Sequence, residues 1–283
     1  MEEYERLGRR AEAAGFDVVS VFHDLFFQPA IFPLLTIARV TERIRLGPAA
    51  LNASTLHPVE IAGQIAALDI ASNGRAYLGL VTGSWLDQLG LDESRPLTRL
   101  REAVELVRRL LGRDTSGFSG ERFTLAPGAA LEYEPLRPSV PLMIGTWRRR
   151  AAGFAGTVAD EVKIGGSANP DMVRLMRQWL GADGPPIVVG AVTVVDEDGA
   201  AARRRVAKAV ELYLDVVGEL DPTLELKPGQ APPLEKFTLA GTPAEVAAHA
   251  RRLLEAGAQR VEFGVPHGRI DLLCDRVVPE LRS

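Results

Sequence analysis

The sequence predicts a single α/β barrel domain over residues 1–283, and three observations support this prediction. Helical and strand-like segments alternate along the chain, which is typical of β-α repeats around a parallel sheet. A chain of 283 residues is long enough to bury the core of one such barrel. Small and polar residues cluster where two predicted strands end, at 47–52 and 82–84. In parallel α/β folds the loops at this edge of the sheet converge and carry the chemistry.

The first half of the chain begins with a helix and continues with alternating strands and helices. Leu7, Ala11 and Ala14 form one apolar stripe of a helix over about 3–14, which ends at Gly15. The next predicted strands are 16–22, 44–49 and 76–81, and the predicted helices are 29–40, 58–70 and 96–111. In the last of these helices, Glu102, Glu105, Arg108 and Arg109 are spaced as on a solvated face with ion pairs.

Residues 112–139 are rich in Gly and Pro, so we expect an excursion from the barrel there. A helix over 197–217 and a Pro-rich loop over 221–235 follow later. The spacing of Thr242, Pro243 and Glu245 is that of a capping box, which predicts a helix start. The remaining predicted strands are 141–145, 161–164, 187–195 and 260–264.

This count gives seven strands, whereas a barrel of this class has eight and begins with a strand. Here a helix begins almost at Met1. Either the first strand was lost through the choice of start site, or the barrel is open at one seam.

Composition predicts a soluble intracellular domain of the size of an enzyme. The net charge of −4 gives no reason to expect nucleic acid or an anionic membrane as partner. The apolar runs are shorter than the roughly 20 residues that cross a bilayer, and the acidic start Met1–Glu5 does not resemble a leader. The single cysteine, Cys274, excludes an internal disulfide and fits a reducing cytoplasm. We therefore expect a cytoplasmic enzyme.

Several motifs together resemble the bacterial luciferase-like superfamily, whose members are TIM-barrel enzymes that use FMN or the deazaflavin F420. The motifs are Arg45–Gly47, His57–Pro58, Ala67–Asp69, Asn73–Arg75, Leu78–Gly79 and Gly83, with further similarity at Gly15–Asp17, Phe27–Pro29, Pro141–Thr146 and Ala159–Glu161. The resemblance runs from about residue 5 to about 265 and favours the F420-dependent branch, near the methylenetetrahydromethanopterin reductase-like proteins. It implies a TIM (β/α)8-type barrel that transfers a hydride between F420 and a small organic substrate.

Three residues are candidates for catalysis. His23 and Asp24 directly follow a predicted strand, where they can contact a ring edge or move a proton, or else cap the next helix. The resemblance favours the first interpretation, because the family places a His or Asp there against its deazaflavin ring. Ser84 stands where related reductases often carry an acidic residue, and a hydroxyl transfers a proton less readily.

The candidates for supporting the cofactor ring lie at two strand ends. The resemblance implies a cis non-proline peptide within 48–51 that bulges toward the ring, whereas the residues alone suggest a plain strand end. At the next strand end Thr82 offers a polar atom, Gly83 allows close approach of the backbone, and Trp85 offers a flat aromatic surface. The predicted ring contacts are Ala49, Ala50, Leu51, Asn52, Thr55, Thr82, Gly83 and Trp85.

Two further strand ends are candidates for the anionic tail of F420. Three consecutive arginines open a predicted helix at 148–150, where cations oppose the helix dipole unless an anion binds. A Gly-Gly-Ser loop precedes another helix and forms a second candidate anion site. The predicted contacts are Gly145, Thr146, Trp147, Arg148, Gly165, Gly166 and Ser167.

The remaining histidines and acids have simpler interpretations. His57 precedes Pro58 and is expected to be a structural residue near an N-cap. The four histidines show no spacing of a metal site, so we expect no metal. Glu262 lies in the middle of a predicted strand and is expected to pair with a base across the sheet. His267 at the strand end can touch substrate or lie on the surface.

The sequence therefore predicts an F420-dependent oxidoreductase acting on a small molecule. Two alternatives stay open. One is an FMN-dependent monooxygenase on the same fold, and the other is a non-catalytic flavin-binding relative, since a protein can keep its fold after losing its catalytic activity. A homodimer is expected because it is the commonest oligomer.

Overall fold

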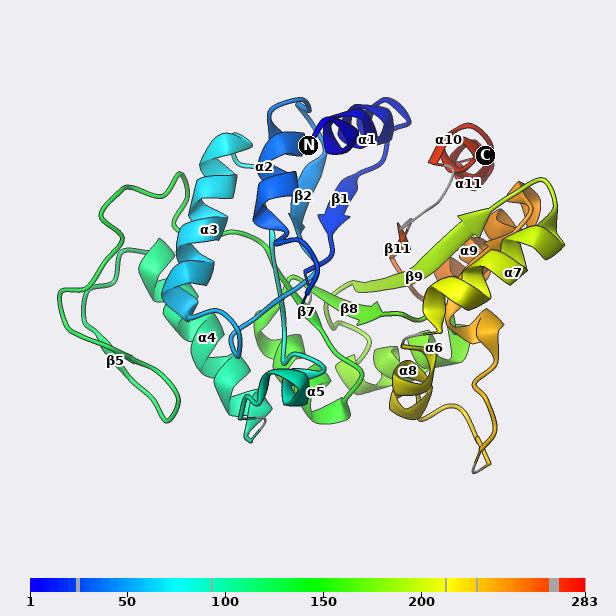
Figure 1. Cartoon of the computed structure of the whole chain (residues 1–283). Helices are drawn as coiled ribbons and strands as arrows, with labels where there is room; N and C mark the ends of the chain where they lie inside the picture. Colours follow the sequence, from blue (N-terminus) through cyan, green and yellow to red (C-terminus); the bar gives the residue numbers. More distant parts are fainter. Residues whose placement is uncertain (24–25, 93, 212, 228, 265–269, 283) are drawn as a thin grey trace. The chain divides into compact units, whose positions relative to one another are not determined.

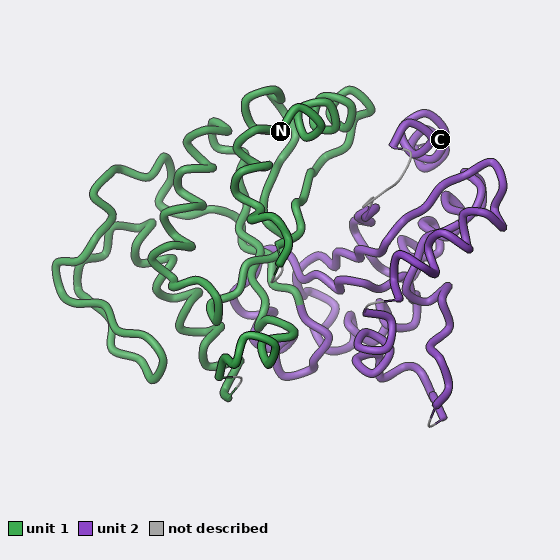
Figure 2. The backbone as a smooth tube through the Cα atoms, viewed as in Figure 1, with its two compact units in different colours: residues 1–145 green, residues 146–283 purple. Residues whose placement is uncertain are grey.

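The computed structural model describes residues 1–283 apart from 24–25, 93, 212, 228, 265–269 and 283. The described chain forms two compact units, Met1–Gly145 and Thr146–Ser283, which Figure 2 shows in different colours. In each unit parallel strands alternate with helices, as the sequence predicts (Figure 1). That the whole chain is one domain stays a prediction.

Unit 1 consists of a parallel sheet and the helices that connect its strands. The strands are β1 (Val18–Val21), β2 (Arg45–Pro48), β3 (Leu51–Asn52), β4 (Leu78–Val81) and β7 (Leu142–Gly145). The helices are α1 (Glu2–Ala13), α2 (Ile31–Ala38), α3 (Pro58–Ala71), η1 (Leu86–Leu89) and α4 (Pro96–Leu111). β1 pairs with β2, β3 with β4, and β4 with β7, all in parallel. A bridge between Leu46 and Ala76 joins β2 to the start of β4.

The predicted excursion over 112–139 contains a short antiparallel hairpin, β5 (Phe118–Ser119) and β6 (Thr124–Leu125). It is anchored to α4 by Glu102, whose carboxylate accepts hydrogen bonds from the backbone N–H groups of residues 121–123 at 2.8–3.0 Å. Glu105 and Arg109 form the predicted ion pair, with 2.7 Å between nitrogen and oxygen.

Unit 2 is organised around its longest strand. Its strands are β8 (Glu161–Gly165), β9 (Ile187–Val195), β10 (Thr238–Gly241) and β11 (Arg260–Gly264). Its helices are α5 (Arg149–Val158), α6 (Pro170–Leu180), α7 (Gly199–Val210), α8 (Leu214–Leu220), η2 (Leu234–Lys236), α9 (Pro243–Glu255), α10 (Ile270–Leu272), η3 (Leu273–Val277) and α11 (Val278–Arg282). β9 pairs in parallel with β8 and β11 along its first half and with β10 along its second half.

Two sequence predictions in unit 2 were wrong. Strand β10 was missed, because its four residues are too few for a periodic pattern and only pairing with the far end of β9 defines it. The helix predicted over 197–217 is two helices, α7 and α8. No Gly or Pro marks this break. The separate α8 places Val217 against the loop after β8, where a Cβ added to Gly166 would lie 3.1 Å from Val217 Cγ1.

Strands β2 and β4 of unit 1 approach each other closely because each carries a glycine at the contact. A Cβ added to Gly47 would lie 2.3 Å from the Tyr77 carbonyl oxygen, and one added to Gly79 would lie 2.2 Å from that of Pro48. Backbone atoms cannot yield as a flexible side chain can, so no larger residue fits at either position. Tyr77 is fully buried, and its hydroxyl lies 2.7 Å from the Ser20 hydroxyl.

The turn between α3 and β4 is held by two arginines. Arg75 donates five hydrogen bonds of 2.7–3.0 Å to oxygen atoms of residues 38, 41, 44 and 72. These bonds connect the C-terminal end of α2 to the turn after α3. Arg137 forms a bidentate pair with the buried carboxylate of Asp69, at 2.6 and 2.9 Å. Asp69 and Arg75, which belong to the motifs at 67–69 and 73–75, therefore have structural roles at this turn.

One face of the unit 2 sheet carries a chain of four charged side chains. Glu262 of β11 pairs with Lys163 of β8, as the sequence predicts, and with Arg260 at 3.2 Å. Arg260 also forms a bidentate pair with Glu161. Gly190 of β9 leaves the space between the outer strands, since an added Cβ would lie 3.0 Å from Lys163 Cε. The four side chains are only 14–17% exposed, so each charge needs its oppositely charged neighbours to offset the cost of burial.

We expect Lys163→Met to lower the free energy of unfolding by about 3 kcal/mol, because it leaves a buried carboxylate short of a partner. Urea denaturation at neutral pH measures this change. As a control, Arg203→Met removes the exposed pair with Glu245 and is expected to cost less than about 1 kcal/mol. Equal costs for the two variants would contradict a stabilising role for the buried chain.

The interaction of Glu262 with Lys163 and Arg260 also predicts how the cost of Lys163→Met depends on pH. Burial by itself raises the pKa of Glu262, but Lys163 and Arg260 outweigh it and hold that pKa below its ordinary value. The stabilisation is therefore complete above the ordinary carboxyl pKa of about 4.3 and is lost as the pH falls through the lowered value. The difference in the free energy of unfolding between wild type and Lys163→Met should therefore become smaller in acid.

Candidate functional site

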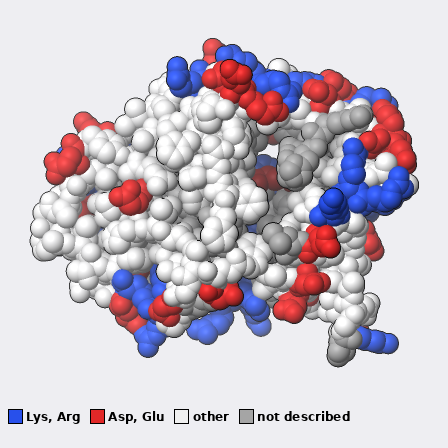
Figure 3. Space-filling model, in the orientation of Figure 1, with Lys and Arg blue, Asp and Glu red and all other residues white. Residues whose placement is uncertain are grey.

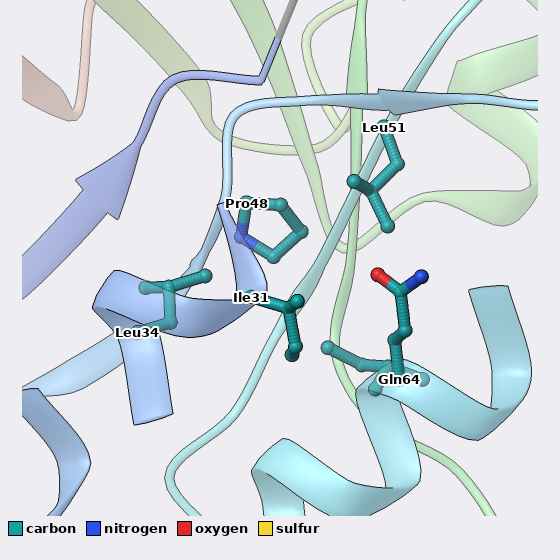
Figure 4. A pocket seen from close by; sticks show the side chains of 6 residues that line it. Ile31, Leu34, Pro48, Leu51 and Gln64 are labelled. Carbon is teal, nitrogen blue, oxygen red and sulfur yellow. The ribbon is translucent and has the colours of Figure 1, made fainter. Parts of the chain in front are cut away.

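The end of the second strand of unit 1 contains a cis peptide bond between Ala49 and Ala50, which confirms the prediction of one within 48–51. It separates β2, which lies within the predicted strand 44–49, from β3, which was not predicted as a strand. The Ala50 methyl faces β4, because a Cβ added to Gly79 would lie 3.3 Å from it. Leu51 is buried and lines a hollow beside α2 and α3, so its side chain points toward the helices (Figure 4).

Asn52 organises the loop after β3. Its carboxamide oxygen accepts hydrogen bonds from the N–H groups of Ser54 and Thr55 at 3.1 Å, and from the Thr55 hydroxyl at 3.2 Å. Backbone N–H groups only donate, so this oxygen is fixed and the Nδ2 amide must point the other way. The residue is 2% exposed, and Nδ2 has no acceptor among the described residues. This amide is therefore available to a ligand.

The end of β4 lies directly over Asn52. Gly83 has a φ of 95°, and a Cβ added there would lie 3.3 Å from Asn52 Cγ. Trp85 is half-buried with a φ of 53°, Thr82 is half-buried, and Ser84 is exposed. The structure thus brings the two predicted ring-supporting clusters of unit 1 together, through Asn52 and Gly83. Their contact with a cofactor stays a prediction.

His23 follows β1 and bonds to the start of the next helical segment. Its Nδ1 accepts a hydrogen bond from the N–H of Ala30 at 3.1 Å, which is the capping interpretation of this residue. Half-burial lowers the pKa of His23, so the ring is neutral near pH 7. With Nδ1 accepting, the proton is assigned to Nε2, which can donate to a ligand. Asp24 and His267 lie outside the described residues.

The start of α5 in unit 2 lacks any cap from a side chain or an acid. Arg148 is the N-cap residue, and its own N–H donates to the Thr146 hydroxyl at 3.0 Å. No described group accepts from the N–H groups of residues 149–151, and the exposed Arg148, Arg149 and Arg150 form no ion pair within the described chain. Free N–H groups, the helix dipole and three cations all favour an anion at this end.

The Gly-Gly-Ser loop after β8 is less available than the sequence suggests. The N–H groups of Gly166 and Ser167 both donate to the Gly190 carbonyl, at 2.6 and 3.1 Å. Trp147 is buried against Phe237 and donates from its indole to the Gly165 carbonyl at 2.9 Å. The loop and the indole therefore stabilise unit 2 itself. A Cβ added to Gly165 would meet no atom within 4 Å. A ligand could therefore contact the backbone of this loop only from that open side of Gly165.

Tyr213 is a neighbour of this loop that sequence reasoning missed. Its ring lies 3.9 Å from the position of a Cβ added to Gly166, and its hydroxyl is buried without a partner among the described residues. Burial raises the pKa of Tyr213. The residues are 47 positions apart, and no local pattern in the sequence connects them. The Ser20–Tyr77 pair was also missed, although polar residues in apolar strands are a usable signal.

Several other expectations can be placed on the structure. His57 is the N-cap of α3, as predicted, and its Nδ1 accepts from the Val59 N–H at 3.2 Å. Within the described ranges no three His, Cys, Asp or Glu side chains are grouped as metal ligands. That the protein needs no metal stays a prediction. No helix in the described part of the chain has the length and apolar character of a membrane span.

Comparison with known proteins gives consistent relatives. The 5,10-methylenetetrahydromethanopterin reductase of Archaeoglobus fulgidus is 27% identical, with 99% of this chain and 96% of the reductase aligned. The structure of the coenzyme F420-dependent tetrahydromethanopterin reductase from Methanopyrus kandleri superposes with a TM-score of 0.83 at 23% identity, covering 99% and 95% of the two chains. An FMN complex of a type II Baeyer-Villiger monooxygenase component from Pseudomonas putida has a TM-score of 0.75 at 16% identity, covering 99% and 93%.

The two structural matches establish the fold, which is the TIM-barrel type of these enzymes with mostly parallel strands. They also show that this fold accommodates both a deazaflavin-dependent and an FMN-dependent enzyme. The family model described as luciferase-like monooxygenase matches residues 1–260. The chain therefore belongs to the luciferase-like monooxygenase family of oxidoreductases.

Proposed function

We propose that the protein is an F420-dependent oxidoreductase that transfers a hydride between the deazaflavin and a small organic substrate. The observation that carries this proposal is the similarity over 99% of the chain to a methylenetetrahydromethanopterin reductase. Bound F420 would supply the hydride-carrying ring carbon, while the protein contributes binding, orientation and proton handling.

The residues of unit 1 suit the uncharged ring of such a cofactor. The Asn52 amide is a donor without a described acceptor, and Gly83 adds no side chain of its own next to it, although the Leu86 side chain lies beside both residues. The ring edge of a deazaflavin offers carbonyl oxygens that such a donor can bind. His23, neutral through burial, holds a proton at Nε2 and is the described candidate for passing it to substrate.

The start of α5 suits the tail of F420, which carries a phosphate and a chain of carboxylates. Three exposed arginines and three free N–H groups gather at this helix end without a described acid. FMN carries a single phosphate, so it would use only part of this positive charge. The arrangement therefore favours F420 over FMN.

Titration of the purified protein with each cofactor, followed by ring fluorescence, tests the proposal. We expect F420 to bind with a Kd in the low micromolar range and FMN to bind at least about tenfold more weakly. Reduced F420 is then offered enones, imines and pterins, and at least one class should be turned over. Tight FMN binding without F420 binding would identify a monooxygenase, and F420 binding without any turnover would identify a non-catalytic relative.

Asn52→Asp tests the ring contact while keeping the hydrogen bonds that hold the loop. Aspartate keeps the oxygen that accepts from Ser54 and Thr55 but replaces the amide donor by a second acceptor. We expect F420 affinity to fall by about 10- to 100-fold, because a donor to the ring is lost. The melting temperature serves as control and should stay within a few degrees. An unchanged Kd would remove Asn52 from the binding site.

Arg149→Glu tests the tail contact, because Arg149 is exposed at the first position of α5. We expect the affinity for F420 to fall by about tenfold and to become less sensitive to salt. Binding of the deazaflavin riboside, which lacks phosphate and carboxylates, is the matched control and should not change. Equal losses for both ligands would mean that the substitution disturbs the fold rather than an anion contact.

A further inference from the structure

The turn of the hairpin between β5 and β6, residues 120–123, lies at the edge of unit 1 where the strands end. Helix α4 begins on that side, because it follows the loop after β4, and the hairpin folds back along it (Figure 1). Phe123 packs edge-on against His57, the N-cap of α3, with 5.3 Å between the ring centres. Figure 3 shows acidic and basic side chains close together at the lower edge of unit 1, where these segments lie in Figure 1. The hairpin turn is therefore a neighbour of the loops that form the candidate ring site.

Asp92, in the segment between η1 and α4, joins the hairpin turn to the loop after β4. Its carboxylate accepts hydrogen bonds from the Ser94 N–H at 2.8 Å and from the Ser94 hydroxyl at 2.9 Å. Nη1 of Arg122 donates to the same carboxylate at 2.7 Å, while its Nη2 donates to the Ser94 carbonyl oxygen at 2.7 Å. The Ser94 hydroxyl and N–H, together with Arg122, hold the pKa of Asp92 at about 2, so this carboxylate stays charged near neutral pH.

Arg99 continues this connection to the loop after β3. It lies in the first turn of α4, and its side chain is only 11% exposed. Its Nη2 lies 3.4 Å from the Asp92 carboxylate, and its Nη1 donates to the Ser54 hydroxyl at 3.2 Å. The Ser54 N–H in turn donates to the carboxamide oxygen of Asn52 at 3.1 Å. A series of polar contacts therefore leads from Arg122 of the hairpin to Asn52.

We propose that Arg99 is a positioning residue for the cofactor ring, and that Asp92 and Arg122 hold Arg99 in place. This inference rests on the proposed function, because it concerns the Asn52 amide that would bind the ring. Nδ2 of Asn52 points at a ligand only while the backbone N–H groups of its loop hold the carboxamide oxygen. Arg99 fixes that loop from behind, through the Ser54 hydroxyl, without touching the ring itself.

A guanidinium group suits this role, because its planar fork can bind two segments at once. Arg99 uses one nitrogen for the loop after β3 and another for the segment before α4. A side chain that supports a binding group needs contacts that fix its own orientation, and Asp92 and Arg122 provide them. Arg95 and Glu121 form a second ion pair at the same hairpin turn, but both side chains are more than half exposed. This exposed pair is the matched control.

Hydrogen exchange of the cofactor-free protein, followed by NMR, tests the positioning step alone. Arg99→Met keeps a long side chain but removes the guanidinium group. We expect the N–H groups of residues 54 and 55 to exchange about tenfold faster, while exchange in the strands of unit 2 does not change. Arg95→Met removes the exposed pair with Glu121 and should leave all of these rates unchanged. Unchanged exchange at 54 and 55 in Arg99→Met overturns the proposal.

Two further variants test the same series of contacts from its two ends. Ser54→Ala removes the acceptor of Arg99 but keeps the backbone N–H that binds Asn52, so it should match Arg99→Met. It decides the question if the half-buried Arg99→Met disturbs folding, and wild-type exchange in Ser54→Ala overturns the proposal. Arg122→Met releases Asp92 from the hairpin and should raise the Kd for F420 about twofold.

A double-mutant cycle tests whether Arg99 acts through Asn52. Arg99→Met should raise the Kd for F420 about fivefold in wild type but less than about twofold in Asn52→Asp, which lacks the amide that Arg99 positions. Equal losses in both backgrounds mean that Arg99 acts elsewhere, and overturn the proposal. A wild type that binds FMN and not F420 contradicts the proposed function alone, and the same cycle then applies to FMN. Binding of neither cofactor overturns both.

Discussion

The contact between two glycines and two backbone carbonyls fixes the candidate ring site of unit 1. Gly47 and Gly79 let β2 and β4 approach until any added Cβ would lie within 2.3 Å of a carbonyl oxygen. The Ala49–Ala50 peptide and β3 continue directly from this contact, as does the end of β4. The position of Asn52 beneath Gly83 is therefore a consequence of close strand packing rather than of the loop sequences themselves.

The neighbouring turn makes that packing stable from the opposite edge of the sheet. Arg75 binds carbonyl oxygens at the end of α2 and before β2, while Arg137 binds Asp69 at the end of α3. Each guanidinium group joins segments that are more than 30 residues apart. In unit 1 the loop after β3 can then carry a polar group without a described partner, the Asn52 amide, because these contacts at the opposite edge hold the strands.

Local physical chemistry explains which features the sequence predicted. The capping box at Thr242 and Glu245 and the N-cap at His57 depend on neighbouring residues, and both are present. The cis peptide was expected only through the family resemblance, since Pro48–Leu51 contains no local signal for it. Predictions failed where distant segments decide. Strand β10 exists through pairing with β9, and the Gly166 and Ser167 amides are used by Gly190.

The distribution of charge in unit 2 explains why the α5 terminus, rather than the other basic groups, is the candidate anion site. Lys163 and Arg260 are matched by Glu161 and Glu262 on the same sheet face, so this chain of charges is neutral and already paired. A ligand anion would have to displace a buried carboxylate there, at a high desolvation cost. The arginines at 148–150 face no such competition within the described chain, and their positive charge adds to that of the helix end. At the start of α5 an anionic ligand would therefore meet arginines whose charge no described residue compensates.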